Sequence, residues 1–353
     1  SSAASDVYKR QSLKDAIASG NVARDFGIEE WDWPQGVGLY GLSMLQDYYR
    51  DDRFMEFFLN WFRSNIERGL PSRNINTTCP YLTLLQILDR IPEPEHSRYE
   101  TMCIEQAEWL MHGLPKTTDG GFQHVTTGIG DRNGVILNEQ QLWLDTLFMA
   151  VLFLQQMGIR CDRKDWRDEA THQVLLHIKY LYCKNNGLFY HGFSFIRNDN
   201  FGGIFWCRGN SWFTLGLTLF LEKADYLDGG TRQFIMDTFR THAEALRSYQ
   251  AEDGLFHTVI DDAASYEEAS GTAAMAAGLL RGMKAGILDE SYRVCADRAI
   301  TALCDCVDTD GTVLKVSAGT AMGMNAEHYK GIGIRPMAYG QALTLIALCE
   351  ALQ

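Results

Sequence analysis

The organisation of the chain can be read from Asp119-Gly120-Gly121-Phe122-Gln123-His124, because two later segments repeat this stretch. They are Asn186-Gly187-Leu188-Phe189-Tyr190-His191 and Asp253-Gly254-Leu255-Phe256-His257. The leading glycines stand at 120, 187 and 254, so the spacing is 67 residues both times (187 − 120 and 254 − 187). Asp-Gly or Asn-Gly before a short aromatic segment is turn chemistry, with glycine supplying a positive φ. A fourth, degenerate copy is expected at Asp310-Gly311-Thr312-Val313.

Between successive copies there is room for two helices that differ in surface chemistry. The first is small or apolar on every side, as in Trp143 to Leu154, Asn210 to Leu221 and Gly271 to Leu280. The second carries charges on one face, as in Trp166 to Tyr182, Thr231 to Tyr249 and Ser291 to Val307. This alternation indicates a buried inner helix followed by a half-solvated outer helix. Further inner helices are expected at Gln35 to Leu45, Thr78 to Leu88 and Met337 to Leu348, and further outer helices at Arg53 to Glu67, Arg98 to Met111 and near Leu13 to Ala18.

Six inner and about six outer helices in a long repeat predict an all-α protein, a closed (α/α)6 toroid. A linear solenoid is the competing arrangement, but its repeats are usually shorter, about 20 to 45 residues. We expect one catalytic domain over residues 13–353, after a loose N-terminal tail over residues 1–12. In such a toroid the loops that lead into the inner helices gather at one mouth. Functional residues are therefore expected near the turns and the N-termini of the inner helices.

Charge and composition limit the partners of the chain. The formal net charge is −13, which argues against nucleic acid or an anionic membrane as a partner. An anionic substrate stays open, because one local arginine can bind one carboxylate. No apolar run reaches the roughly 20 uninterrupted residues that a membrane span requires. A monomer or a homodimer is expected.

The sequence predicts no metal site and no cofactor, because its cysteines are scattered and the common metal-binding and nucleotide-binding motifs do not occur. Nine cysteines are scattered singly, which predicts reduced thiols and a cytoplasmic enzyme, although a chain that starts without Met leaves a removed signal peptide open. Cys304 and Cys306 would point to different faces of a helix, which disfavours a zinc site. The His-Glu-x-x-His, Gly-x-Ser-x-Gly and Gly-Lys-Ser/Thr motifs are absent.

The first catalytic candidate is Asp145, one carboxylate in the apolar, apparently helical run from Asn138 to Met149. A buried carboxylate must be paired, be protonated or serve a purpose, since leaving it charged and unpartnered costs several kcal/mol or more. The other candidates at the expected mouth are aromatic, acidic, amide or histidine side chains. Rings that stack on sugar C–H faces beside such polar groups are typical of a carbohydrate site.

Each candidate also has a purely structural interpretation. Trp206 and Trp212 could be core residues, and His124 and His257 could bind turn carbonyls. A guanidinium such as that of Arg208, between an apolar run and a helix start, could bind a substrate carboxylate or form an internal salt bridge to Glu268. The segments Ser270-Gly271-Thr272 and Asn210-Ser211 have the chemistry of helix caps.

Six motifs along the chain resemble those of family 105 glycoside hydrolases, the unsaturated rhamnogalacturonyl hydrolases and their relatives. The likeness spans about residues 30 to 350 and includes Gln35-Gly36-Val37-x-Leu39-Tyr40-Gly41, Gly120-Gly121-Phe122-x-His124, Trp143-Leu144-Asp145-x-Leu147-x-Met149, Gly187-Leu188-Phe189-Tyr190-His191, Phe205-Trp206-x-Arg208-x-x-x-Trp212 and Ser270-Gly271. The resemblance implies an (α/α)6 barrel that removes a 4,5-unsaturated uronic acid from the non-reducing end of an oligosaccharide left by a polysaccharide lyase. It implies that Asp145 is the general acid and base. The predicted substrate-binding residues are Trp33, Asn76, His124, His191, Trp206, Arg208, Trp212 and Ser270.

One position departs from the family pattern. Well-known members place a second active-site Asp where this chain has Asn76, and an amide cannot take a proton. The expected mechanism is protonation of the C4=C5 bond by Asp145, followed by addition of water. The apolar flanks Leu144, Leu147 and Phe148 predict a raised pKa for Asp145, as such an acid requires.

Two other functions remain possible from the sequence. One is a non-catalytic carbohydrate-binding toroid, which the Asn76 departure favours. The other is a conventional inverting glycosidase on saturated chains, with Glu268 or Asp32 as the second carboxylate. The source of the substrate also stays open among pectin, ulvan, arabinogalactan and glycosaminoglycan fragments.

Overall fold

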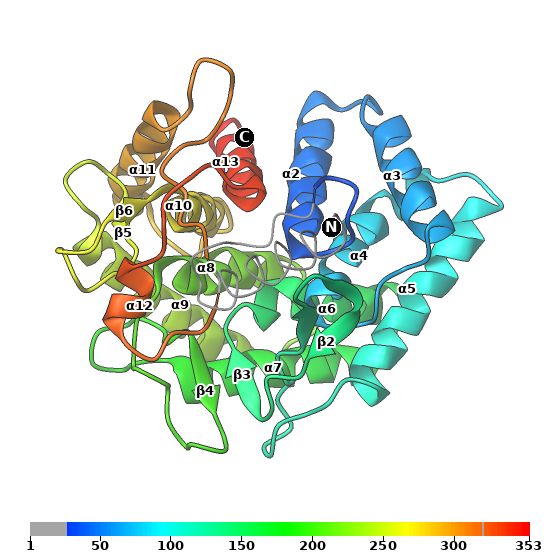
Figure 1. Cartoon of the computed structure of the whole chain (residues 1–353), viewed down its shortest axis with the longest axis horizontal. Helices are drawn as coiled ribbons and strands as arrows, with labels where there is room; N and C mark the ends of the chain where they lie inside the picture. The colour runs from blue at the N-terminus through cyan, green and yellow to red at the C-terminus, as the bar shows by residue number, and fades with distance from the viewer. Residues whose placement is uncertain (1–26, 320) are drawn as a thin grey trace, which may run out of the picture.

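Residues 27–319 and 321–353 are described by the computed structural model of the chain (Figure 1). The tail expected over residues 1–12 and the outer helix expected near Leu13 to Ala18 lie outside these residues. Six inner helices form a closed ring, because each contacts the next and α13 packs on α2. They are α2 (Trp33–Tyr49), α4 (Ile75–Ile87), the π-helix η2 (Leu147–Val151) continued by α6 (Leu152–Arg160), α8 (Cys207–Glu222), α10 (Ala269–Lys284) and α13 (Ala338–Ala351). The predicted (α/α)6 toroid is confirmed.

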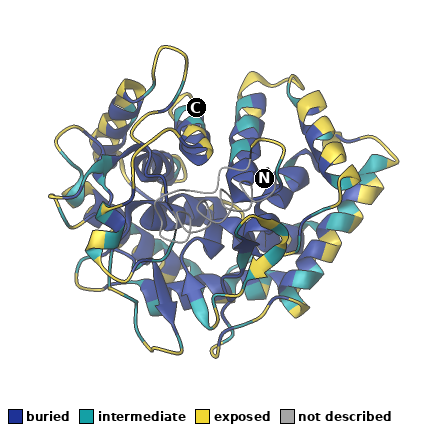
Figure 2. Ribbon diagram, in the orientation of Figure 1, coloured by how far each residue is buried: buried dark blue, intermediate teal, exposed yellow. Residues whose placement is uncertain are grey.

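Outer helices cover this ring, and their solvent side carries the exposed residues (Figure 2). They are α3 (Met55–Glu67), α5 (Glu95–His112), α7 (Lys164–Leu181), α9 (Gly229–Tyr249) and α11 (Arg293–Asp305). Close backbone contact between inner helices depends on small residues. A Cβ added at Gly278 of α10 would lie 2.5 Å from the carbonyl oxygen of Thr214 in α8, so a larger residue would push the two helices apart.

All four Asx-Gly segments form the same turn. Their glycines have φ of +84° (Gly120), +76° (Gly187), +95° (Gly254) and +87° (Gly311). In each copy a short antiparallel bridge or backbone bond closes the turn, for example from Cys183 N–H to the Leu188 carbonyl at 2.8 Å. The degenerate copy at Gly311 is therefore a true repeat of the first three.

Three of the turns are bound by the fourth residue of the inner helix that follows. The backbone N–H of Phe189 donates to Asn210 Oδ1 at 2.7 Å, that of Phe256 to Thr272 Oγ1 at 2.9 Å, and that of Val313 to Gln341 Oε1 at 3.1 Å. Asn210 and Thr272 are thus turn-binding residues inside helices, not the caps that the sequence suggested. The helices begin earlier, at Cys207 and Ala269, and Glu268 caps α10.

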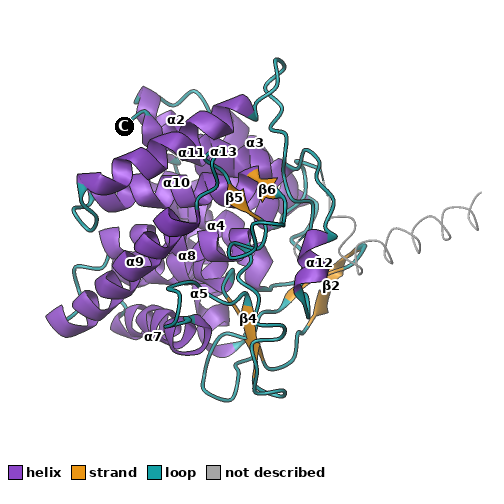
Figure 3. Cartoon of the chain, turned by 90° about the vertical axis from the view of Figure 1, so that its left-hand side faces the viewer, coloured by secondary structure: helices purple, strands orange, loops and turns teal. Residues whose placement is uncertain are grey.

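Small strands cluster at the end of the barrel where the inner helices begin, beside the short helix α12 (Ala326–Lys330) (Figure 3). They form three antiparallel pairs: β1 (Thr126–Gly128) with β2 (Asp131–Ile136), β3 (Gln141–Trp143) with β4 (Gly192–Ser194), and β5 (Phe256–His257) with β6 (Glu267–Glu268). This end is the predicted mouth. In the part of the chain that the structure describes, no helix combines the length and the apolar character needed to cross a bilayer.

Gly254→Ala should destabilise the protein by about 2 to 5 kcal/mol, because alanine is strained at positive φ and its Cβ would lie 2.5 Å from the Arg298 carbonyl of α11. Gly229→Ala is the matched control, since Gly229 begins α9 with open space around it and should change stability by less than about 1 kcal/mol. Denaturant or thermal unfolding of the two variants measures the difference. Equal stability of both variants would contradict the strain argument.

Candidate active site

Asp145 lies in a turn at the start of an inner helix rather than within it. The sequence predicted a helix from Trp143 to Leu154, but β3 continues through Trp143 and the regular α-helix starts only at Leu152, after the π-helix. The cause is strand pairing: Trp143 faces Gly192 across β3 and β4, and Leu144 N–H donates to the His191 carbonyl at 3.0 Å. This pairing places the side chain of Asp145 beside that of His191.

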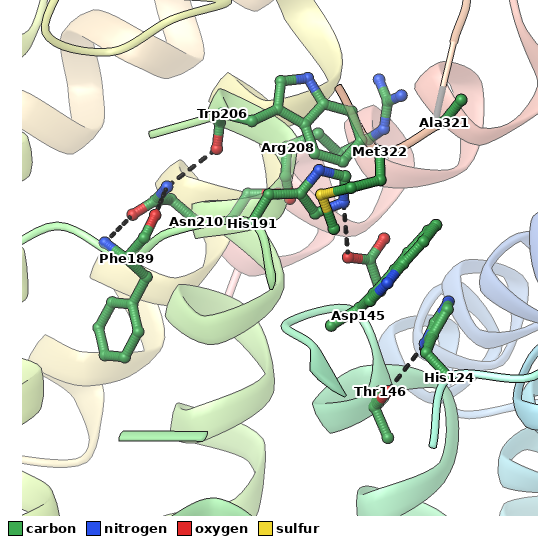
Figure 4. Close-up of polar contacts among 12 residues, drawn as sticks. His124, Asp145, Thr146, Phe189, His191, Trp206, Arg208, Asn210, Ala321 and Met322 are labelled. Carbon is green, nitrogen blue, oxygen red and sulfur yellow. Dashed lines mark hydrogen bonds and ion pairs between the residues drawn. The ribbon is translucent and has the colours of Figure 1, made fainter. Parts of the chain in front are cut away.

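Asp145 and His191 form a buried acid–imidazole pair (Figure 4). Asp145 Oδ2 lies 3.4 Å from His191 Nε2, and the two residues are 8% and 2% exposed. Neither of these two atoms makes a regular hydrogen bond within the described residues. Their 3.4 Å contact is thus longer than a strong hydrogen bond, and both atoms are buried from solvent.

The electrostatics of Asp145 differ from the sequence prediction. Burial has the largest single effect and raises its pKa, as expected from the apolar flanks, but the contact with His191 and smaller lowering effects together outweigh it. The net pKa of Asp145 therefore lies below that of an ordinary aspartate, and the predicted raised pKa is wrong for the free protein. The reason is the contact with His191, which is far from Asp145 in the sequence and was therefore not predicted as its partner.

The Trp143 ring lies between His124 and His191, the histidines that follow the first two turns. The His124 ring stacks on it at 4.4 Å and 12°, and the His191 ring meets it at 5.3 Å and 61°. Burial lowers the pKa of His124 to about 3, so this ring is neutral at working pH, with Nδ1 bonded to Thr146 Oγ1 at 2.8 Å. Trp143 was not among the predicted site residues, although its place two residues before Asp145 in an aromatic strand was a usable signal. His257 instead contacts the Ser265 carbonyl, as its structural interpretation predicted.

The other predicted aromatic residues differ in burial, since Trp206 and Trp212 are fully buried and Trp33 is slightly exposed. Trp206 packs on the His191 ring at 4.4 Å and is fully buried. Trp212 lies within the core and meets Trp33 edge-on at 5.9 Å. Trp33 is slightly exposed, as is Asn76 in the first turn of α4. The Asn76 side chain makes no hydrogen bond within residues 27–319 and 321–353, which leaves its amide free for a ligand.

Arg208 and Ser270 lie behind this surface. Arg208 is 0% exposed and its guanidinium donates to Ser270 Oγ at 2.9 Å, to the Ser317 carbonyl at 3.0 Å and to the Gly319 carbonyl. It also lies over the Trp206 ring, 4.5 Å from the centroid. Ser270 Oγ in turn donates to Glu268 Oε2 at 2.5 Å. Arg208 is therefore linked to Glu268 through a hydroxyl, and it does not reach the mouth.

The two acids considered as a second catalytic carboxylate both cap helices. Glu268 is fully buried and accepts from the N–H groups of Ser270 and Gly271 at 2.7 and 2.6 Å. Asp32 caps α2 by accepting from Trp33 N–H at 2.7 Å. Within the described ranges, no group of three or more His, Cys, Asp or Glu side chains could hold a metal ion. The nine cysteines are free thiols, with Cys304 exposed and Cys306 buried.

Comparison with known proteins places this site in a family. The sequence model of a family described as Glycosyl Hydrolase Family 88 matches residues 15–353. The unsaturated rhamnogalacturonyl hydrolase YesR of Bacillus subtilis (strain 168) is 31% identical over 349 residues, which cover 99% of this chain and 96% of that protein.

Solved structures agree with the sequence comparison. The crystal structure of a possible member of the GH105 family from Salmonella enterica superposes with a TM-score of 0.88 and 32% identity, over 98% of this chain and 93% of that one. The unsaturated glucuronyl hydrolase of Bacillus sp. GL1 shares the fold at a TM-score of 0.69 and 19% identity, over 97% and 95% of the two chains. The chain therefore belongs to glycosyl hydrolase family 88, as its resemblance to the unsaturated uronyl hydrolases predicted, and it is a glycoside hydrolase.

Proposed function

We propose that this hydrolase removes a 4,5-unsaturated uronic acid from the non-reducing end of an oligosaccharide by hydrating the C4=C5 bond, with Asp145 as general acid and base. The observation that carries the proposal is the pair of Asp145 and His191, buried at the mouth of the barrel, while Glu268 and Asp32 are held at helix ends. The full-length relative from Bacillus subtilis, an unsaturated rhamnogalacturonyl hydrolase, supports this class of substrate.

The reaction can proceed with a single carboxyl group. The C4=C5 bond is an enol ether conjugated to a carboxylate, so a proton from Asp145 to C4 creates oxocarbenium character at C5. Water adds at C5 and gives its proton to the same, now ionised, carboxylate. The resulting hemiketal opens to a ketone, and the hemiacetal left at C1 expels the next sugar as an alcohol and becomes an aldehyde. A two-carboxylate glycosidase would need a second placed acid, and Glu268 and Asp32 are occupied at helix ends.

Substrate binding favours protonation of Asp145, which the free protein disfavours. In the free protein Asp145 has a depressed pKa and is mostly ionised at neutral pH. A bound unsaturated uronate brings a second negative charge close to it, and a like charge raises the pKa of a carboxyl group. The substrate itself therefore promotes the protonated form of Asp145 that the first step requires.

The slightly exposed side chains are proposed to contact the sugar, and the buried ones to support them. Trp33, Asn76 and Trp143 have surface open to the mouth, while His124 and His191 flank Trp143. Behind them lie the supporting residues, which are Trp206, Arg208, Trp212 and Ser270. Arg208 acts in this scheme by holding Trp206 in place beneath His191.

Asp145→Asn should lower turnover of lyase-generated oligosaccharides by about 100- to 10,000-fold, because the amide cannot donate the proton. The decline in near-ultraviolet absorbance of the conjugated double bond measures the reaction. Asp310→Asn is the matched control, since the equivalent turn position of another repeat is already Asn186. Cleavage of saturated chains, or binding of unsaturated fragments without any loss of absorbance in the wild type, would rule out the hydration mechanism.

The pH dependence should differ between kcat/KM and kcat. The acid form of Asp145 is lost as pH rises, so both parameters should fall toward high pH. Because the free protein has a depressed pKa at Asp145 and the bound substrate raises it, the decline in kcat/KM should begin at lower pH than the decline in kcat. Initial rates from below pH 3.8, the ordinary aspartate pKa value, up to pH 9 locate the onset of the decline at low and at saturating substrate. Coincident limbs would contradict a substrate-induced rise.

Asn76→Ala should raise KM about 2- to 10-fold with little change in kcat, the effect of losing one hydrogen bond to a sugar hydroxyl. Asn76→Asp tests whether this position needs an acid. If Asp145 handles both proton transfers, the carboxylate at position 76 should not raise kcat. A tenfold gain in kcat for Asn76→Asp would mean that the present site lacks a required group.

A further inference from the structure

Tyr329 connects a distant part of the chain to the acid–imidazole pair. It lies in α12, within the long connection between α11 and α13, and is 1% exposed. Its hydroxyl oxygen is 2.8 Å from His191 Nδ1, the ring nitrogen opposite the one that faces Asp145. Its ring packs beside Trp206, in a small apolar cluster with Val259 and Ile332 that is separate from the main core.

The neighbours of the Tyr329 hydroxyl favour one direction for this hydrogen bond. Gly323 N–H donates to Tyr329 Oη at 3.1 Å, so the oxygen already accepts one bond. The single O–H can reach His191 Nδ1 at 2.8 Å or Met322 Sδ at 3.7 Å. An imidazole nitrogen is a much stronger acceptor than a thioether sulfur. These neighbours favour donation from the hydroxyl to Nδ1, which can accept only while it carries no proton.

The consequence for His191 follows from imidazole chemistry. A neutral imidazole with an unprotonated Nδ1 carries its proton on Nε2, and that nitrogen faces Asp145 Oδ2 at 3.4 Å. We propose that Tyr329 is a positioning residue that holds His191 in the Nε2–H tautomer, so that the imidazole donates toward the carboxylate of Asp145. The hydroxyl acts on the reacting acid through His191 and touches no substrate itself.

The surroundings of Tyr329 hold its hydroxyl in place. Asn325 caps α12 by accepting from His328 N–H at 2.9 Å. The preceding connection lies tightly on the loop after β4, where a Cβ added at Gly202 would come 2.4 Å from the Met324 carbonyl. The tyrosine is thus anchored from its own helix and from the loop that precedes α8. These contacts hold the Tyr329 hydroxyl at a defined position beside Nδ1 of the His191 ring.

Nitrogen NMR of the histidine ring tests the tautomer directly. In protein labelled with 15N-histidine, long-range proton–nitrogen spectra distinguish protonated from unprotonated ring nitrogens, and His191→Gln identifies the signals of His191 by their loss. The wild type should show a protonated Nε2 and an unprotonated Nδ1. Tyr329→Phe, which keeps the ring and removes the hydroxyl, should move the Nδ1 signal, because the unprotonated nitrogen loses its hydrogen-bond donor. A protonated Nδ1 in the wild type, or an unchanged Nδ1 signal in Tyr329→Phe, would overturn the proposal.

Two further variants control for loss of a buried hydroxyl and for the choice of acceptor. Tyr99→Phe removes a buried hydroxyl that lies on α5, near Glu95, and should leave the His191 signals unchanged. Met322→Leu removes the competing sulfur and should also leave the tautomer unchanged. A tautomer change in Met322→Leu would mean that the hydroxyl donates to sulfur, which contradicts the assignment. Thermal unfolding of each variant confirms that the compared proteins are folded.

Kinetics test the effect on the proposed reaction. Tyr329→Phe should lower kcat about 5- to 10-fold with KM within about twofold, because one positioning hydrogen bond is lost while the substrate contacts remain. A change in KM alone would indicate a packing role and contradict the positioning role. This kinetic arm rests on the proposed function, whereas the NMR arm uses no substrate. Wild-type protein that fails to turn over unsaturated substrates would therefore refute the proposed function and leave the tautomer assignment standing.

Discussion

The Asx-Gly turn, held between an outer helix and the next inner helix, is the constraint on which the barrel and its site depend. A Cβ added at Gly187 would lie 2.9 Å from the Thr241 carbonyl of α9, while the N–H of Phe189 is bound by Asn210 of α8. The turn is thus anchored on both sides within three residues. Because the chain leaves each turn in a fixed direction, the residue four positions after the glycine reaches the mouth. His124 and His191 are those residues in the first two copies.

Pairing between successive repeats then converts this geometry into a site. The strand that follows the first turn, β3, pairs with β4, which follows the second. Asp145 leaves β3 at the point where His191 enters β4, so the acid and the imidazole meet although 46 residues separate them (191 − 145). Trp143 fills the space between the two turn histidines. A repeat that serves stability in the barrel therefore also sets the spacing of the proposed catalytic groups.

Much of this architecture was predictable from sequence, because it depends on local patterns. Glycine after Asp or Asn, and the alternation of apolar and one-sided helices, predicted the turns and both layers of the barrel. Strand pairing overrode helix periodicity around Trp143. The inner helix that follows begins with a π-helix in contact with α4 and α8, which the local pattern did not predict. The depressed pKa of Asp145 depends on His191, and the orientation of His191 on Tyr329, 138 residues further along. Arg208 looked like a ligand for a carboxylate, since its charge is visible in the sequence whereas the carbonyls that bind it are not.

Asp145 is proposed to act without a second catalytic acid, because Glu268 and Asp32 are engaged in hydrogen bonds at helix starts. Glu268 cannot move into the mouth without removing the partners of two N–H groups at the start of α10, and Ser270 would lose its acceptor as well. Asp32 is tied in the same way to the start of α2. Asn76 is 8% exposed, but its amide can act neither as an acid nor as a base. Hydration of a double bond suits such a site, because the group that gives the first proton becomes the base for the second. The charge of the bound substrate favours the protonated form that the first step needs, and transfer of that proton leaves the ionised form that the second step needs, so one carboxyl group serves both.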